Sequence, residues 1–369
     1  MKKPIQKRRT FIKAIGITAG ATLLVPATWA NINVPESSDK LGVALVGLGY
    51  YSTGLLAPAL QQTTYCKLTG IVTGSPEKIP VWQKRYGIED KNVYNYENMS
   101  QIADNKDIDV IYIVLPTGLH SRYGVIAANT GKHVWCEKPM ARTVAECQAL
   151  IDACRKNRVK LSIGYRMQHE PNTQTLIRYA KTKPFGQIIK VKAEAGYYDG
   201  RSDHWKQNKA LGGGAMYDMG VYPLNAARYV TGEEPIAVVA RHETKRPEIY
   251  DEVDETTYFD LEFSGGAIAN CITSLGMSMN ELRVDCKNGW YGLKPFQSYS
   301  GIKGRASDGT IFNKRIPNQQ ARQMDDDALA IINDTAVLVP GEEGLKDIRL
   351  VEAIYKAAQS GKTINLTSL

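Results

Sequence analysis

The chain has 369 residues, of which 43% are hydrophobic and 23% are charged. A chain of this length is too long for one compact core, so we expect two domains of an ordinary globular protein. The net charge of +8 comes mostly from six lysines and arginines that end at Lys13. No basic stripe interleaved with aromatic residues follows them, which argues against a nucleic-acid-binding protein.

The first 30 residues have the pattern of an export signal. Lys7-Arg8-Arg9-Thr10-Phe11-Ile12-Lys13 is a twin-arginine pattern, and the moderately apolar run Ala14–Ala27 follows it. Small residues at Thr28 and Ala30 permit cleavage after Ala30. The alternative is a basic amphipathic helix or a membrane anchor, but this run is short for a bilayer span and rich in Gly, Ala and Thr. We therefore expect a signal peptide over residues 1–30, a short arm over residues 31–40, and a periplasmic or otherwise exported protein with no membrane span after cleavage.

From Leu41 to about Gly164, short β-branched runs alternate with helical patterns. This alternation predicts a parallel, doubly wound sheet with right-handed crossovers. The expected helices include Pro76–Tyr86, Ser121–Thr130 and Thr143–Asn157, and the expected strands are Leu41–Val46, Cys66–Val72, Val110–Leu115, His133–Cys136 and Lys160–Ile163. Residues 41–164 are thus predicted to form a Rossmann domain in an α/β protein.

Residues 165–369 are predicted to form a second, α+β domain. Its expected helices are Pro171–Thr182 and Ala215–Thr231, and its expected strands are Ile188–Tyr198, Ile236–His242, Thr256–Phe263 and Ala267–Thr273. Period-two alternation in these strands predicts a large, mostly antiparallel sheet with helices on one face. Two final helices are expected near Asn318–Asn333 and Leu345–Ser360, with Gly361 as a C-terminal cap, and they are candidates for packing back on the Rossmann domain.

A glycine-rich segment follows the first expected strand directly. Gly47 permits a tight turn, and Gly49 lets the backbone approach a pyrophosphate at the N-terminus of the next helix. The motif alone is weak, and an ordinary glycine turn is the alternative, but its place in a βαβ series is that of a dinucleotide site. We therefore predict that a nicotinamide dinucleotide binds here, with contacts from Gly47, Gly49, Tyr50, Tyr51 and Ser52.

The end of the second expected strand favours NADP, with NAD as the alternative. NAD sites usually carry an acidic residue at this point, whereas this chain has Thr73. Thr73 and Ser75 can donate hydrogen bonds to a 2′-phosphate, and Lys78 can add positive charge. In the alternative interpretation Ser75-Pro76 simply caps the next helix, and both interpretations can hold together.

Two segments carry the candidate catalytic residues. Glu137-Lys138-Pro139 ends a Rossmann strand, at the edge of the sheet where ligands bind. Asp218 and Tyr222 are four residues apart, so on a helix they share a face. The alternatives are a surface lysine, a local cap or ion pair, and a core tyrosine with a satisfied hydroxyl group. The histidines have no metal-ligand spacing, so no metal site is expected.

Together these motifs resemble the glucose–fructose oxidoreductase, inositol dehydrogenase and rhizopine-catabolism (Gfo/Idh/MocA) family over nearly the whole chain after the signal. The resemblance rests on the glycine-rich loop, Leu115–His120, Glu137-Lys138-Pro139, Gly164-Tyr165-Arg166 and the glycine-rich segment before Asp218. It is closest to the periplasmic glucose–fructose oxidoreductase branch, because Tyr222 stands where most members have histidine.

The resemblance implies roles for individual residues. Tyr222 would be the general base for a sugar hydroxyl, Lys138 would stabilise its phenolate and lower its pKa, and Asp218 would orient the sugar. Implied cofactor contacts are Leu115, Pro116, His120, Glu137 and Lys138, and implied weaker substrate contacts are Arg166, Tyr198 and Asp218.

The function that follows is that of an exported, NADP-dependent sugar oxidoreductase. Hydride transfer from aldose C1 would give a lactone, and a second sugar would regenerate the cofactor in place, since no free nicotinamide pool is expected outside the cytoplasm. The alternatives are a glycoside hydrolase that oxidises its substrate transiently and a non-catalytic sugar-binding protein. The expected partners are small-molecule sugars and further copies of the chain in a homo-oligomer.

Overall fold

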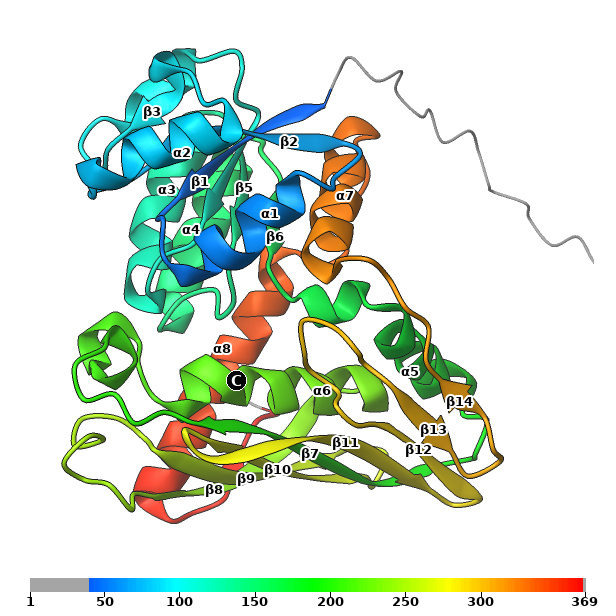
Figure 1. The fold of residues 1–369 in the computed structure, drawn as a ribbon. Helices are drawn as coiled ribbons and strands as arrows, with labels where there is room; N and C mark the ends of the chain where they lie inside the picture. The colour runs from blue at the N-terminus through cyan, green and yellow to red at the C-terminus, as the bar shows by residue number, and fades with distance from the viewer. Residues whose placement is uncertain (1–39, 368–369) are drawn as a thin grey trace, which may run out of the picture. The chain divides into compact units, whose positions relative to one another are not determined.

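The computed structural model describes residues 40–367, so the predicted signal peptide and nearly all of the predicted arm lie outside the described residues. The described chain is an α/β protein with two sheets (Figure 1). The first sheet is parallel throughout, with the order β3-β2-β1-β4-β5-β6. Its strands are β1 (Leu41–Val46), β2 (Cys66–Val72), β3 (Val93–Tyr94), β4 (Val110–Ile113), β5 (His133–Cys136) and β6 (Leu161–Ile163). The predicted doubly wound sheet is confirmed, although the two-residue β3 was not predicted.

The helices of this domain are α1 (Ala57–Leu60), α2 (Ile79–Tyr86), α3 (His120–Asn129) and α4 (Val144–Lys156). Helix α4 begins where the Thr143 side chain accepts a hydrogen bond of 3.1 Å from the backbone N–H of Glu146. The strand order reverses between β1 and β4, and in open α/β sheets ligands bind at the carboxyl ends of the strands beside such a reversal. The glycine-rich loop after β1 and the segment after β4 both lie at that edge.

The second sheet has nine strands in the order β14-β13-β12-β11-β7-β10-β9-β8-β15. Only the pair β7 and β10 is parallel, so the predicted mostly antiparallel sheet is confirmed. The strands are β7 (Ile188–Tyr198), β8 (Pro235–Glu243), β9 (Thr256–Phe263), β10 (Ile268–Ser274), β11 (Gly276–Cys286), β12 (Gly289–Leu293), β13 (Gly304–Ala306), β14 (Ile311–Phe312) and β15 (Ile364–Asn365). Strands β11 to β15 were not predicted.

Four helices complete the described chain: α5 (Pro171–Thr182), α6 (Val221–Thr231), α7 (Gln319–Ile332) and α8 (Gly341–Ser360). Helix α6 packs on β7 and β10, and α5 packs on α6. Although α7 is far from the Rossmann domain in sequence, it lies beside α1 and β2 (Figure 1). Helix α8 contacts α4 and β6 at one part of its length and β8 at another, and it ends at Gly361, whose φ is +63°.

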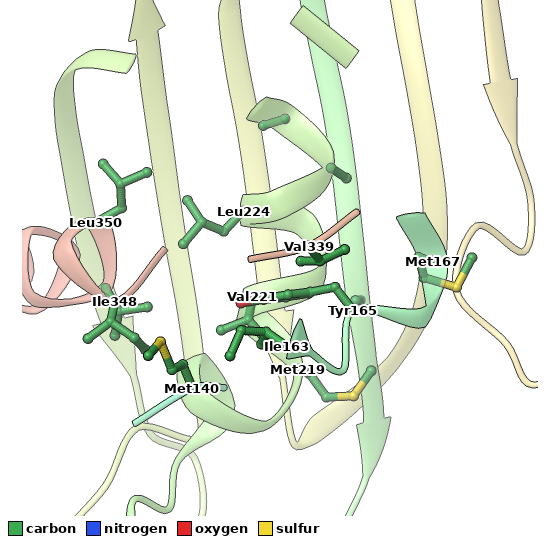
Figure 2. Packing of buried hydrophobic residues seen from close by; sticks show 14 of the residues in the cluster. Met140, Ile163, Tyr165, Met167, Met219, Val221, Leu224, Val339, Ile348 and Leu350 are labelled. Carbon is green, nitrogen blue, oxygen red and sulfur yellow. The ribbon is translucent and has the colours of Figure 1, made fainter. Parts of the chain in front are cut away.

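A shared apolar core joins the Rossmann domain to the second domain. Met140 comes after β5, Ile163 lies in β6, Val221 and Leu224 lie on α6, and Ile348 lies on α8. All five are fully buried in one cluster (Figure 2). This packing fixes the end of β5 relative to the start of α6, which carry the candidate catalytic residues. Within residues 40–367, no helix is both long and apolar enough to cross a bilayer.

Candidate active site

The two glycines of the glycine-rich loop differ in the space around them: protein atoms crowd Gly47, whereas Gly49 has free space beside it. Gly47 has a φ of +93°, and a Cβ there would lie 2.4 Å from the carbonyl oxygen of Val114, so only glycine fits. A Cβ at Gly49 would meet nothing within 4 Å. The Ser52 hydroxyl donates a 2.6 Å hydrogen bond to the Gly47 carbonyl and closes the turn. The backbone at Gly49 is therefore accessible to a ligand such as a pyrophosphate.

The segment after β2 lies against this loop. Thr73 is buried, and its hydroxyl oxygen accepts a 3.0 Å hydrogen bond from the backbone N–H of Ser75. The Lys78 Nζ atom donates a 3.0 Å hydrogen bond to the Leu48 carbonyl, which places its positive end at the glycine-rich loop. Pro76 opens the following helical turn, as the capping interpretation requires, but the Ser75 side chain makes no capping hydrogen bond.

His120 links two segments of the sheet edge instead of lining an open pocket. Its ring is buried, with Nδ1 2.8 Å from the Pro139 carbonyl and Nε2 2.7 Å from the Leu115 carbonyl. Burial is the main cause of a lowered pKa for this imidazole. His120 thus lies between the segments that contain Leu115-Pro116 and Lys138-Pro139, and its predicted contact with a ligand stays a prediction.

Glu137 also faces the protein interior. The Tyr112 hydroxyl donates a 2.6 Å hydrogen bond to Glu137 Oε1, and burial raises the pKa of this carboxyl group. A Cβ at Gly164, which directly follows β6, would lie 2.7 Å from the same oxygen, so this position requires glycine. Glu137 thus supports the edge of the sheet through Tyr112, and its predicted contact with the cofactor stays a prediction.

The three predicted catalytic residues come together. Lys138 Nζ donates a 2.8 Å hydrogen bond to the backbone carbonyl of Asp218 and lies 4.5 Å from the centre of the Tyr222 ring. Burial opposes ionisation of Tyr222, but the positive charges of Lys138 and Arg166 outweigh it, so the pKa of this phenol is lowered. A general base needs this shift, because a free tyrosine has a pKa of about 10.

The turn that carries Asp218 is π-helical, Met216–Gly220, and it continues into α6. One carboxylate holds its start: Asp254 Oδ2 accepts a 2.8 Å hydrogen bond from the Met216 N–H. Gly214, with a φ of +106°, lies so close to Asp254 that a Cβ would be 2.3 Å from its other oxygen. π-Helical turns of this kind occur frequently at functional sites.

The Asp218 carboxylate has two partners that the sequence did not reveal. Its Oδ2 lies 2.8 Å from Lys206 Nζ and 2.8 Å from the Tyr197 hydroxyl. Burial opposes ionisation of Asp218, but the charges of Lys206 and Lys138 outweigh it, and the pKa of Asp218 is lowered. The carboxylate is therefore ionised and fixed in orientation.

Tyr198, the predicted substrate contact, lies outside this group. Its side chain is 64% exposed, and the Arg246 guanidinium lies 4.4 Å from its ring centre. Successive strand residues point to opposite faces, so Tyr197 rather than Tyr198 faces Asp218. The strand was predicted with the right bounds, and the alternation could have identified Tyr197 once the inner face was known.

Arg166 and Tyr299 complete the group of side chains. Arg166 is buried, with Nη2 3.5 Å from the Tyr222 hydroxyl and Cζ 4.8 Å from the Tyr299 ring centre. The Tyr299 ring is in turn 6.1 Å from the ring of Tyr51, which follows the glycine-rich loop. Tyr299 lies between two short strands that were not predicted, and no sequence pattern singles it out.

Comparisons with known proteins agree with this geometry. Residues 41–165 match the family model "Oxidoreductase family, NAD-binding Rossmann fold", residues 173–292 match the "GFO/IDH/MocA C-terminal domain", and residues 292–366 match the "Oxidoreductase family, C-terminal alpha/beta domain". The crystal structure of an aldose-aldose oxidoreductase from Caulobacter crescentus, complexed with glycerol, is 40% identical, with a TM-score of 0.86 over 89% of this chain and 100% of that one. The chain belongs to the Gfo/Idh/MocA oxidoreductase family.

Other members of the family are more distant in sequence. A D-xylose 1-dehydrogenase [NADP(+)] from Haloarcula marismortui is 28% identical over 89% of this chain and 94% of its own length. A D-glucoside 3-dehydrogenase from Escherichia coli is 24% identical over 89% of this chain and 99% of its own length. This member of the Gfo/Idh/MocA family is thus an NAD(P)-dependent oxidoreductase, and the resemblance to that family drawn from its motifs is confirmed.

Proposed function

We propose that this protein is an exported, NADP-dependent aldose oxidoreductase that recycles its cofactor on a second sugar. The observation that carries the proposal is the contact between Lys138 and Tyr222, 4.5 Å from nitrogen to ring centre, beside an ionised and oriented Asp218. This group can remove a hydroxyl proton and hold a sugar. The 40% identical relative named as an aldose-aldose oxidoreductase supports an aldose at both halves of the cycle.

The residues around the glycine-rich loop fit a dinucleotide. The open space at Gly49 leaves room for a pyrophosphate that a Cβ would obstruct, and Lys78 places positive charge at the same loop. At the end of β2 the buried Thr73 stands where an acidic residue would repel a 2′-phosphate. These features, together with a relative named for NADP, support NADP over NAD.

When bound, the nicotinamide supplies a hydride acceptor. Tyr222, as the phenolate, takes the proton of the C1 hydroxyl group while hydride leaves the same carbon, so the sugar loses two electrons and two hydrogens and becomes a lactone. Lys138 offsets the negative charge of the phenolate before this transfer, and Asp218 accepts hydrogen bonds from other sugar hydroxyls. In the second half of the cycle the Tyr222 phenol would return its proton to the carbonyl oxygen of an incoming sugar while the carbonyl carbon takes up hydride, so that sugar gains two electrons and two hydrogens and becomes an alcohol.

A Tyr222→Phe variant tests the assigned base. We expect the rate of bound-nicotinamide reduction by an aldose to fall by about 100-fold or more, with the amount of bound NADP unchanged. Tyr198→Phe, at an exposed tyrosine outside the site, is the matched control. Unchanged turnover in Tyr222→Phe would refute the role.

Recycling and export need separate tests. We expect mass spectrometry of the purified protein to find NADP, an aldose to produce reduced-nicotinamide absorbance, and a second sugar to remove it without added cofactor. A requirement for continual exchange with added NADP would refute recycling, and release of free sugar from a glycoside without an oxidised product would indicate a hydrolase.

Export is tested by replacing Arg8 and Arg9 together with lysine, which we expect to retain the protein in the cytoplasm.

A further inference from the structure

Arg166 is a buried cation whose hydrogen bonds go only to neutral groups. It is 2% exposed and follows β6 at the start of a short helical segment. Its Nη1 donates a 2.8 Å hydrogen bond to the Ser298 carbonyl and a 2.6 Å hydrogen bond to Gln319 Oε1. Its Nε is buried and has no hydrogen-bond partner among residues 40–367. None of these groups offsets the charge of the guanidinium.

Arg228, an arginine buried to a similar degree, has an ordinary environment. It is 4% exposed and forms ion pairs with Glu234 at 2.7 Å, with Glu343 at 2.9 Å and with Asp347. Arg166 has no carboxylate oxygen within 4.0 Å in the described part of the chain. A buried charge without a counter-charge costs free energy of folding. We therefore look near Arg166 for a group that becomes negative during the reaction.

The titratable groups that act on the Arg166 charge are phenols. Tyr222, Tyr51 and Tyr299 all interact with it, and the Tyr222 hydroxyl is 3.5 Å from Nη2. The other charged or titratable groups that act on Tyr222 are Lys138, Glu137 and Asp218.

Neither carboxyl group in this set forms an ion pair with Arg166. Glu137 accepts the hydrogen bond of Tyr112, and although the charge of Arg166 acts to lower the pKa of this carboxyl group, burial outweighs it and raises that pKa. Asp218 is paired with Lys206 at 2.8 Å. The Tyr222 oxygen is thus the site at which negative charge can meet the guanidinium.

We propose that Arg166 is a positioning residue that, together with Lys138, stabilises the phenolate of Tyr222. Both cations face the Tyr222 ring, with Lys138 Nζ 4.5 Å and Arg166 Cζ 5.6 Å from its centre, and Arg166 Nη2 also reaches the hydroxyl group at 3.5 Å. Burial acts to raise the pKa of Tyr222, and without Arg166 the charge of Lys138 would have to overcome this effect of burial alone. This inference rests on the proposed role of Tyr222 as the general base.

The test measures ionisation of Tyr222 in the full-length holoenzyme. Ultraviolet difference titration of each protein against its own Tyr222→Phe counterpart isolates this phenol from the other tyrosines. In Arg166→Gln we expect the phenolate to form about 1–3 pH units higher than in the wild type, the usual effect of one nearby opposite charge. The rate of bound-nicotinamide reduction by an aldose should shift along the pH axis with it, so activity lost at neutral pH returns at higher pH.

A second variant leaves the arginine in place. Gln319→Glu is nearly isosteric and sets a carboxylate against Arg166 Nη1, at the present 2.6 Å contact, so it offsets the guanidinium charge without opening a cavity. We expect the same direction of shift as in Arg166→Gln. Arg349→Gln, at an exposed arginine of α8, removes an equal charge and should leave the titration unchanged.

The outcomes separate this inference from the proposed function. Unshifted titrations in both Arg166→Gln and Gln319→Glu would overturn it, and so would activity that falls equally at every pH or only through a higher KM, because those results indicate packing or ligand contact. A shifted titration in a protein whose wild type oxidises no aldose would support the electrostatic role and refute the proposed reaction.

Discussion

Lys206 is expected to hold the Asp218 carboxylate in the orientation that a sugar requires. Its Nζ lies 2.8 Å from Asp218 Oδ2 and 2.8 Å from the Tyr197 hydroxyl, and the side chains of Lys206 and Asp218 are only 19% and 12% exposed. Replacement of Lys206 by methionine removes the charge and keeps an unbranched side chain. The carboxylate would then have only Tyr197 as a partner, and the pKa of Asp218 would rise.

The size of the effect follows from the distance and the burial. Two unit charges 2.8 Å apart attract by about 6 kcal/mol at an effective dielectric constant of 20, and desolvation offsets most of that. The net free energy lost when the Lys206–Asp218 ion pair is broken lies between about 1 kcal/mol, the value for an exposed pair, and about 3–5 kcal/mol, the value for a buried one. A loss of about 2 kcal/mol in the transition state lowers kcat/KM for the sugar about 30-fold.

The assay compares kcat/KM and bound NADP in Lys206→Met with the same quantities in Lys209→Met, an exposed lysine of the same segment. We expect a fall of about 10- to 100-fold in Lys206→Met only, with bound NADP unchanged in both. If Lys206 acts through Asp218, the double variant with Asp218→Asn should lose little more than Asp218→Asn alone. Unchanged kcat/KM in Lys206→Met, or fully additive losses in the double variant, would refute this reasoning.

Other predictions concern the glycine-rich loop, Asp218's second partner and a buried acid. Gly49→Ala should lower bound NADP without changing the melting temperature of the cofactor-free protein, because its Cβ would meet no protein atom within 4 Å. Gly47→Ala should lower that temperature, because its Cβ would clash with a carbonyl oxygen 2.4 Å away, and equal effects in both variants would contradict this. Tyr197→Phe should lower kcat/KM about 10-fold through loss of one hydrogen bond to a charged group, while Tyr198→Phe should not. Burial raises the pKa of Asp327 to about 6, so its contribution to stability is present below about pH 4 and is lost as the pH rises through 6. Asp327→Asn should therefore raise the melting temperature at pH 7.5 more than at pH 4, and an equal change at both would count against this assignment.

The Rossmann domain could be predicted because each of its signals is local. Strand β1 is an unbroken buried run, Gly47 is required by its own backbone angle, and α4 opens on a threonine cap three residues before a glutamate. Propensity and pattern over a few residues decide such features. Strand β3 was missed for the same reason, since two residues carry no pattern.

The outer strands of the second sheet could not be predicted from such signals. Strand β11 alternates only weakly between buried and half-exposed residues, and β13 and β14 contain three and two residues. They become strands because long-range pairing in the sheet places them beside β7 and β12. The segment that carries Tyr299 depends on these strands for its position, so the presence of Tyr299 at the site could not be predicted from the sequence either.

The same limit explains what was missed within the site. Lys138, Asp218 and Tyr222 were predicted because motif and helical spacing identify them, but the partners of Asp218 come from a strand and a loop with no motif. Arg166 and Arg228 are both arginines in helical segments, and nothing local separates the one with three carboxylate partners from the one with none. Only the folded chain shows that difference. Since an uncompensated buried charge is costly, Arg166 is better explained by a charge that forms on Tyr222 during the reaction than by stability of the resting fold.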